Sequence, residues 1–312
     1  MLAAQIDHLT KKYGRITAID DLSIGIAANQ IFGFLGPDGA GKTSLFRILC
    51  GILSATAGRV VVAGTDVRQS PEKIKPELGY MAQKFALYAD LTVRENLDFF
   101  AALFQTPAPG LADRKKELLQ FASLWQFQDR LAGKLSGGMK QKLALCCTLI
   151  HTPRILILDE PTTGVDPVSR QEFWEMLLPL PAGGTTVIVS TAYMDEAAKC
   201  DRIAIMNRGK ILQVGTPAEL KAPLREKIFA VHSEQLLEIQ EALTPWVKDA
   251  QLLGDRLHVR LPEELMAGAV NATGAAEGRE WLQKKLSELG YTVTLDMVEP
   301  SLEDVFVELL AK

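Results

Sequence analysis

The spacing of apolar and polar side chains changes several times along this chain. Residues 1–35 alternate apolar and polar positions and carry turn signals at Gly14 and Asn29, which is typical of antiparallel strands. Three later runs are largely apolar and are typical of strands in a mostly parallel sheet. They cover residues 155–158, 186–190 and 202–206. The pattern therefore predicts an α/β domain whose sheet is entered through an antiparallel β subdomain.

Helical spacing predominates in the region that separates the first strands from these apolar runs. Residues 91–104 have a helical period, and Thr92 followed by Glu95 has the spacing of an N-terminal capping box. A second helix is expected over residues 113–124, after a break rich in proline and glycine. We interpret the region of about residues 84–138 as a helical insertion in the α/β domain.

The last part of the chain has a different order of elements. Residues 225–312 predict strand, helix, two strands, helix and strand, followed by an amphipathic helix capped by Ser301. This βαββαβ order indicates a small ferredoxin-like α+β domain with a loop over residues 266–278. We therefore expect two domains, at residues 1–220 and 225–312.

A glycine-rich segment follows the apolar residues 31–35 and precedes a helical pattern. It fits the phosphate-loop motif G-x-x-x-x-G-K-[ST] in its required strand-to-helix setting. Its glycines allow backbone N–H groups to surround phosphate oxygens, at the positive end of a helix dipole. Lys42 is expected to reach the β and γ phosphates, and the Thr43 hydroxyl to bind Mg²⁺. The predicted nucleotide-binding residues here are Gly36, Pro37, Asp38, Gly39, Ala40, Gly41, Lys42, Thr43 and Ser44.

Two carboxylates, Asp159 and Glu160, end the apolar run at residues 155–158. Ligands of α/β sheets gather at the carboxyl ends of the strands, so both side chains are expected beside the phosphates. One carboxylate can belong to the Mg²⁺ shell, and its neighbour can orient or deprotonate water. The sequence thus predicts an ATP and Mg²⁺ site.

Composition and charge exclude several other roles. Hydrophobic residues make up 47% of the 312 residues, but no apolar run approaches the roughly 18 residues of a membrane helix. The N-terminus lacks the features of a secretion signal, which favours the cytosol. The four cysteines have no C-x-x-C spacing and are expected to be buried. Residues 220–312 carry 10 basic and 16 acidic side chains, which argues against nucleic acid as a partner.

These motifs occur together in one order: phosphate loop, Gln83, helical insertion, Leu-Ser-Gly-Gly-Met at residues 135–139, and the Asp-Glu strand. In that order and spacing they resemble an ATP-binding cassette (ABC) ATPase over residues 1 to about 220. The end of the chain, from Glu299 to Phe306, resembles the extra domain of cassettes that serve ABC-2 type exporters.

The resemblance implies further roles. Tyr13 would stack on adenine, Gln83 would sense Mg²⁺ and the membrane partner, and Glu160 would be the catalytic base. Asp166 would be the D-loop aspartate. The signature residues would contact the γ-phosphate held by the opposite cassette, and they are Ser136, Gly137, Gly138 and Met139. The implied metal site comprises Thr43, Gln83 and Asp159, and the implied catalytic residues are Glu160, Gln83 and Asp166.

Two positions depart from the family pattern. Asp38 stands where the family usually has asparagine and places an extra carboxylate near the triphosphate. Ala192 stands where the family has its switch histidine, which would contact the γ-phosphate and help to position Glu160 and water. His151, before the Asp-Glu strand, is expected at the surface and not as a substitute.

The phosphate loop with Asp38, the Leu-Ser-Gly-Gly-Met segment and the missing switch histidine together resemble the first cassette of paired-cassette multidrug exporters of Gram-negative bacteria. In such pairs one composite site is degenerate. The resemblance implies a peripheral subunit at the cytoplasmic face of the inner membrane. Its implied partners are ABC-2 type permease subunits, a second cassette of the same or another chain, and a periplasmic adaptor. Two main hypotheses remain open: a slow ATPase, and a non-hydrolysing regulatory subunit that lends its signature residues to a competent cassette. A soluble cassette of DNA repair or translation is a weaker third hypothesis, against which the acidic tail and the single cassette argue.

Overall fold

A computed structural model describes residues 1–84, 87–262 and 273–310, without the side chains of residues 273–275. The chain divides into two compact units, Met1–Pro217 and Ala218–Lys312. α8 (Pro217–Lys221) lies at the division. Each unit has its own hydrophobic core.

The first unit contains two sheets. The smaller one is antiparallel and has the order β2 (Ile16–Ala27), β1 (Leu2–Tyr13), β4 (Ala57–Val62), β5 (Thr65–Asp66). The larger one has the order β10 (Lys210–Gly215), β9 (Arg202–Asn207), β3 (Ile31–Leu35), β8 (Thr186–Thr191), β7 (Ile155–Asp159), β6 (Leu78–Met81). Every pair in it is parallel except β9 with β10.

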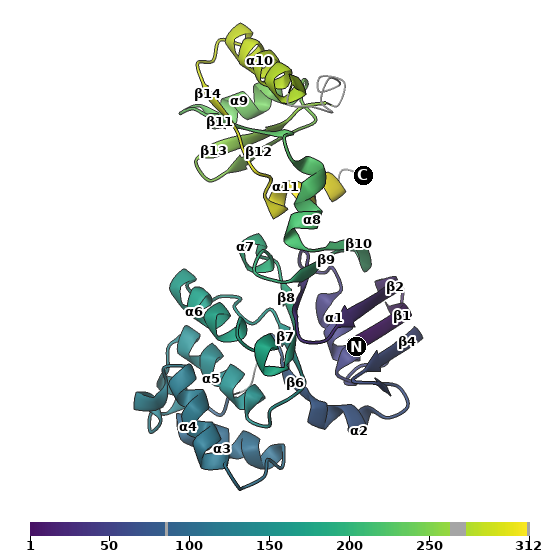
Figure 1. The fold of residues 1–312 in the computed structure, drawn as a ribbon, viewed down its shortest axis with the longest axis vertical. Coiled ribbons are helices and arrows are strands. Elements are labelled where there is room, and N and C mark those ends of the chain that lie inside the picture. The colour runs from purple at the N-terminus through teal and green to yellow at the C-terminus, as the bar shows by residue number, and fades with distance from the viewer. Residues whose placement is uncertain (85–86, 263–272, 311–312) are drawn as a thin grey trace. The chain divides into compact units, whose positions relative to one another are not determined.

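Burial explains why the central strands are apolar without alternation. Every residue of β3, β7 and β8 is buried, because helices cover both faces of the parallel sheet. α1 (Lys42–Leu49) packs between the two sheets, and α5 (Gly137–Leu149) and α6 (Pro167–Leu177) lie on the opposite side of the large sheet (Figure 1). This confirms the predicted α/β domain with an antiparallel subdomain.

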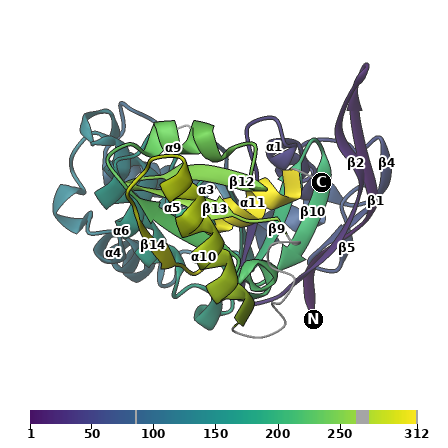
Figure 2. The same ribbon diagram turned by 90° about the horizontal axis from the view of Figure 1, so that it is seen from above.

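The helical insertion contains α3 (Val93–Leu103) and α4 (Leu111–Phe121), which pack on α5. Thr92 and Glu95 form the predicted capping box, each accepting a hydrogen bond from the other's backbone N–H. The insertion and the small sheet lie at opposite ends of the unit in both views (Figures 1 and 2). The remaining short helices are α2 (Pro71–Ile74) and α7 (Met194–Ala197).

The second unit has the predicted element order. Its strands are β11 (Ile228–His232), β12 (Asp249–Leu253), β13 (Arg256–Arg260) and β14 (Thr294–Met297), in the antiparallel order β12-β13-β11-β14. α9 (Leu236–Leu243) and α10 (Thr273–Glu288) pack on one face. The other face carries His258 and Arg260, which pair with Asp304 and Glu308 of α11 (Leu302–Leu310).

Two expectations about irregular segments need comment. The loop expected over residues 266–278 is wrong for residues 273–278, because α10 begins at Thr273. The rest of that loop lies outside the described residues. All four cysteines are buried free thiols, as predicted. No helix in the described part of the chain has both the length and the apolar character needed to cross a bilayer.

His151 is half-buried, whereas the sequence-based prediction placed it at the surface without specific partners. Its ring stacks on Phe104 with the centroids 3.9 Å apart, and its Nε2 lies 2.9 Å from the carbonyl oxygen of Leu78. Burial lowers the pKa of His151, while the bond to Leu78 opposes that shift. The ring therefore links the end of α3 to β6, the strand that leads to Gln83.

We predict that the folded chain loses stability as the pH falls below about 6.5, the ordinary pKa of histidine. The unfolded chain takes up the proton first, so the free energy of unfolding decreases in that window, by less than the one-proton limit of about 1.4 kcal/mol per pH unit. His151→Phe keeps an aromatic ring and should have a shallower slope. Urea titrations from pH 7.5 to 5 measure it, and equal slopes would contradict the assignment.

Candidate active site

The phosphate loop joins β3 to α1, and its glycines are required by close backbone contacts. A Cβ at Gly36 would lie 2.3 Å from the carbonyl oxygen of Met206, and one at Gly41 equally close to that of Ala18. Gly39 and Gly41 have φ angles of 79° and 103°, which disfavour other residues. The loop is thus a tight turn whose backbone lies against β9 and β2.

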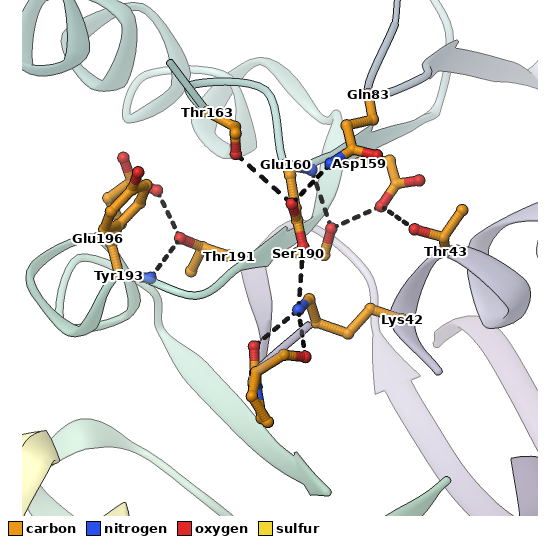
Figure 3. A network of polar contacts seen from close by, with 12 residues as sticks. Lys42, Thr43, Gln83, Asp159, Glu160, Thr163, Ser190, Thr191, Tyr193 and Glu196 are labelled. Carbon is orange, nitrogen blue, oxygen red and sulfur yellow. Dashed lines mark hydrogen bonds and ion pairs between the residues drawn. The ribbon is translucent and has the colours of Figure 1, made fainter. Parts of the chain in front are cut away.

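Lys42 is almost completely buried, with 3% of its side chain exposed. Its Nζ donates to the carbonyl oxygens of Gly36 and Pro37, at 2.7 and 3.1 Å. It also lies 3.0 Å from Oε1 of Glu160 (Figure 3). The ammonium group therefore links the phosphate loop to the carboxylate that follows β7.

Asp159 is fully buried and accepts two hydrogen bonds on the same oxygen. Thr43 Oγ1 and Ser190 Oγ donate to its Oδ1 at 3.2 and 2.9 Å (Figure 3). Oδ2 is buried and has no hydrogen-bond partner among the described residues. Burial raises the pKa of Asp159, and the charge of Glu160 adds to this, while the bonds from Ser190 and Thr43 oppose it.

The carboxylate of Asp159 and the hydroxyl of Thr43 fit a divalent cation. Mg²⁺ prefers carboxylate and hydroxyl oxygens and keeps several waters, so it needs few protein ligands. Asp159 and Thr43 offer such oxygens beside the phosphate loop, and a cation would give Oδ2 its missing partner. The residues present therefore fit Mg²⁺ at this point.

Glu160 has a left-handed backbone with φ of 48°, which is rare for a residue other than glycine. Gln83 Nε2 donates to its Oε2 at 3.0 Å, and its own N–H donates to Ser190 Oγ at 2.9 Å. Such a conformation costs about 1–3 kcal/mol and persists only where the surroundings fix it. Lys42, Gln83 and Ser190 fix it here, with the carboxylate directed at the phosphate loop (Figure 3).

A cavity of about 370 Å³ lies in front of these groups. It is lined by Ala18, Gln83, Glu160 and residues 38–44. Asp38 is exposed at its edge. Tyr13 lies beside it, because its hydroxyl is 3.3 Å from Ser44 Oγ, and 45% of the residue is exposed. The predicted nucleotide-binding residues of the phosphate loop and Tyr13 thus lie close to the predicted metal-binding residues Thr43, Gln83 and Asp159.

Two predicted site features make no hydrogen bond to the phosphate loop or Glu160 among the described residues. Ser136 caps α5 by accepting from the N–H of Met139 at 3.3 Å. Asp166 caps α6 by accepting from the N–H of Ser169 at 2.9 Å, and it is exposed. Within the described part of the chain, no hydrogen bond or ion pair joins residues 136–139 or Asp166 to the phosphate loop or Glu160. Both are helix caps in this structure.

Ser190 was not predicted as a site residue. It lies near the carboxyl end of β8 and touches both Asp159 and the backbone of Glu160. A polar side chain at that end of an otherwise apolar buried strand is a usable signal, because the adjacent strand β7 ends in the two carboxylates. Ala192 follows two residues later, exposed, with only a methyl group to offer.

We predict that Ser190→Ala lowers the free energy of unfolding by about 1–3 kcal/mol, because it leaves the buried N–H of Glu160 without its partner. Ser23 offers a matched control, since its Oγ accepts from the N–H of His8 at an exposed position. Ser23→Ala should cost less than Ser190→Ala in the same urea titration. Equal costs would contradict the role of Ser190.

Comparison with known proteins agrees with this geometry. The family model described as ABC transporter matches residues 19–163. The probable multidrug ABC transporter ATP-binding protein YbhF of Escherichia coli (strain K12) is 44% identical over 69% of this chain, and the chain spans only 37% of that protein. The daunorubicin resistance ATP-binding protein DrrA2 of Streptomyces coeruleorubidus is 33% identical over 98% of this chain and 94% of that protein.

A solved structure extends the comparison to the fold. The dimeric structure of a post-hydrolysis state of the ATP-binding cassette MJ0796, bound to ADP and Pi, superimposes with a TM-score of 0.62 at 25% identity. It covers 68% of this chain and 98% of that one. The match with DrrA2 also includes the second unit. The chain therefore belongs to the ABC transporter family.

Proposed function

We propose that this chain binds MgATP and hydrolyses it slowly to drive export through a separate ABC-2 type membrane permease. The observation that carries the proposal is the cluster of Lys42, Glu160 and Gln83 around one cavity, with the buried Asp159 bonded to Thr43 of the same lining. These groups can bind phosphates, hold a cation and accept a proton from water, which are the three needs of phosphoryl transfer to water.

The binding step uses the phosphate loop. Its backbone N–H groups and Lys42 would surround the β and γ phosphates, and Tyr13 would stack on adenine. Lys42 is bonded to Glu160, so phosphate oxygens that attract the ammonium group would compete with this carboxylate. Binding would thereby free Glu160 for the reaction. The exposed Asp38 adds a negative charge at the loop and should weaken binding modestly.

The chemical step uses Glu160 and Gln83. Mg²⁺, when bound by Thr43, Asp159 and Gln83, supplies positive charge to the phosphate oxygens. Glu160 would accept a proton from water. At the same time the water oxygen would bond to the γ-phosphorus and the bond from that phosphorus to the bridging oxygen would break, giving ADP and phosphate. Gln83 contacts Glu160 through Nε2 and can fix the orientation of the carboxylate.

The rate is limited by Ala192. A methyl group cannot donate a hydrogen bond to the γ-phosphate, and removing one such donor commonly costs about 10²–10³ in rate. The intact Glu160 supports slow hydrolysis. Ala192, together with a signature segment that makes no bond to its own phosphate loop, favours the alternative of a regulatory subunit that lends residues 136–139 to a competent cassette.

The remaining parts of the proposal concern assembly. MJ0796 is described as a dimer with ADP and Pi, which supports pairing of this chain with a second cassette, the same chain or another. Residues 136–139 and Asp166 would then serve the partner's nucleotide. We also propose a permease and a periplasmic adaptor as partners, and a peripheral place at the cytoplasmic face of the inner membrane. The second unit, with the predicted βαββαβ order, would be a ferredoxin-like accessory domain.

We predict that steady-state ATPase assays of the purified chain give weak turnover that Ala192→His raises by tenfold or more, because the new side chain supplies the missing donor. Glu160→Gln should abolish turnover in both backgrounds. Brisk wild-type turnover, comparable with that of Ala192→His, would contradict a degenerate site. No turnover in either protein would favour the regulatory alternative.

A further inference from the structure

Glu196, in α7, is a buried carboxylate to which the proposed mechanism assigns no task. Only 1% of it is exposed, and it accepts three hydrogen bonds from side chains. Thr162 Oγ1 and Arg170 Nε donate to Oε1 at 2.7 and 3.0 Å. Thr191 Oγ1 donates to Oε2 at 2.7 Å (Figure 3). A buried charge is tolerated only when it is paired in this way, so the position of Glu196 and those of its donors depend on one another.

One donor leads to the phosphate loop. Thr191 is the last residue of β8, and its carbonyl oxygen accepts from the N–H of Gly36, the first residue of the loop, at 3.3 Å. Its hydroxyl also accepts from the N–H of Tyr193 at 3.0 Å, so the turn that contains Ala192 is held closed (Figure 3). The Glu196 carboxylate thus fixes Thr191, whose carbonyl oxygen binds the first residue of the phosphate loop.

The second donor leads to the catalytic carboxylate. Thr162 lies two positions after Glu160, and its carbonyl oxygen accepts from the N–H of Val165 at 3.1 Å. Between them, Thr163 donates from its N–H to the Glu160 carbonyl at 3.3 Å and places its hydroxyl 3.5 Å from Glu160 Oε2 (Figure 3). Glu196 therefore anchors the turn that lies against the Glu160 side chain.

The third donor leads to α6. Arg170 donates from Nη2 to both carboxylate oxygens of Asp195 at 3.1 Å, and its guanidinium lies 3.9 Å from the centre of the Tyr193 ring. Because Arg170 keeps Asp195 as a partner, loss of the Glu196 charge alone would leave this ion pair in place. Of the three hydrogen bonds of Glu196, the one from Arg170 therefore depends least on the Glu196 charge.

We propose that Glu196 is a positioning residue for hydrolysis: it holds the turn at residues 162–165 in register with the phosphate loop, and so orients Glu160. The inference rests on the proposed function. Glu160 has a strained backbone, so its carboxylate is sensitive to how the following turn is anchored. A misplacement of about 1 Å can cost about 10²-fold in rate without affecting nucleotide affinity in proportion.

Two variants test the proposal in the full chain. Glu196→Gln keeps the size of the side chain and removes its charge. Thr162→Val removes only the hydrogen bond between Glu196 and the turn at residues 162–165. Neither variant alters Lys42, Thr43 or Tyr13. We expect kcat to fall about tenfold or more in both, measured in the Ala192→His background, while the Kd of a non-hydrolysable ATP analogue changes by less than about threefold.

Glu72→Gln is the control, since Glu72 is 78% exposed and pairs with Lys75 three residues away. It should leave both kcat and Kd unchanged. An unchanged kcat in Thr162→Val would overturn the proposal. So would a loss of kcat matched by an equal loss of analogue binding in both variants, because a merely structural residue would affect both.

A second readout does not need turnover. The N–H of Val165 is bonded inside the anchored turn, so its hydrogen exchange should be faster in Glu196→Gln and in Thr162→Val than in the wild type. Unchanged exchange in both variants would overturn the anchoring role. If the wild type and Ala192→His show no turnover while exchange responds as expected, the proposed hydrolysis fails and the anchoring by Glu196 stands.

Discussion

The active site depends on one buried ion pair between Lys42 and Glu160. The two groups are 3% and 9% exposed and lie 3.0 Å apart. Such a pair offsets its desolvation only when further hydrogen bonds complete it, and removal of one partner leaves an uncompensated charge at a cost of about 3–5 kcal/mol. Gly36 and Pro37 complete the shell of Lys42, and Gln83 that of Glu160. The ion pair holds the Lys42 ammonium group at the phosphate loop, where the phosphates of ATP would bind.

The parallel sheet is what brings the pair together. β3, β8 and β7 are adjacent in space although other elements separate them in the chain. Their carboxyl ends therefore meet at one edge, where the hydroxyl of Thr43 reaches Asp159 across 116 residues of sequence. Complete burial of these strands favours one register, because a shift would disturb the packing on both faces of the sheet.

Local motifs, and the meeting of Asp159 and Glu160 with the phosphate loop, could be predicted from the sequence, whereas pairings of residues outside any motif could not. The phosphate loop and the capping box of Thr92 and Glu95 are encoded within a few residues, and both are present. Ser190 bonds to residues 30 and 31 positions earlier, and one donor to Glu196 lies 34 positions away, so these contacts emerge only once the neighbouring strands are known. The contacts of His151 were missed for the same reason, because Phe104 and Leu78 lie far from it in sequence. The roles of residues 136–139 and Asp166 stay predictions.

Exchange of the Lys42 ammonium group between Glu160 and phosphate is the central claim, and nucleotide binding tests it most directly. Calorimetric titration with a non-hydrolysable ATP analogue and Mg²⁺ compares the wild type with Glu160→Gln. Removing the competing carboxylate should tighten binding severalfold, because Lys42 then has no charge to give up. Equal or weaker binding by Glu160→Gln would contradict the exchange and leave the ion pair as a structural feature only.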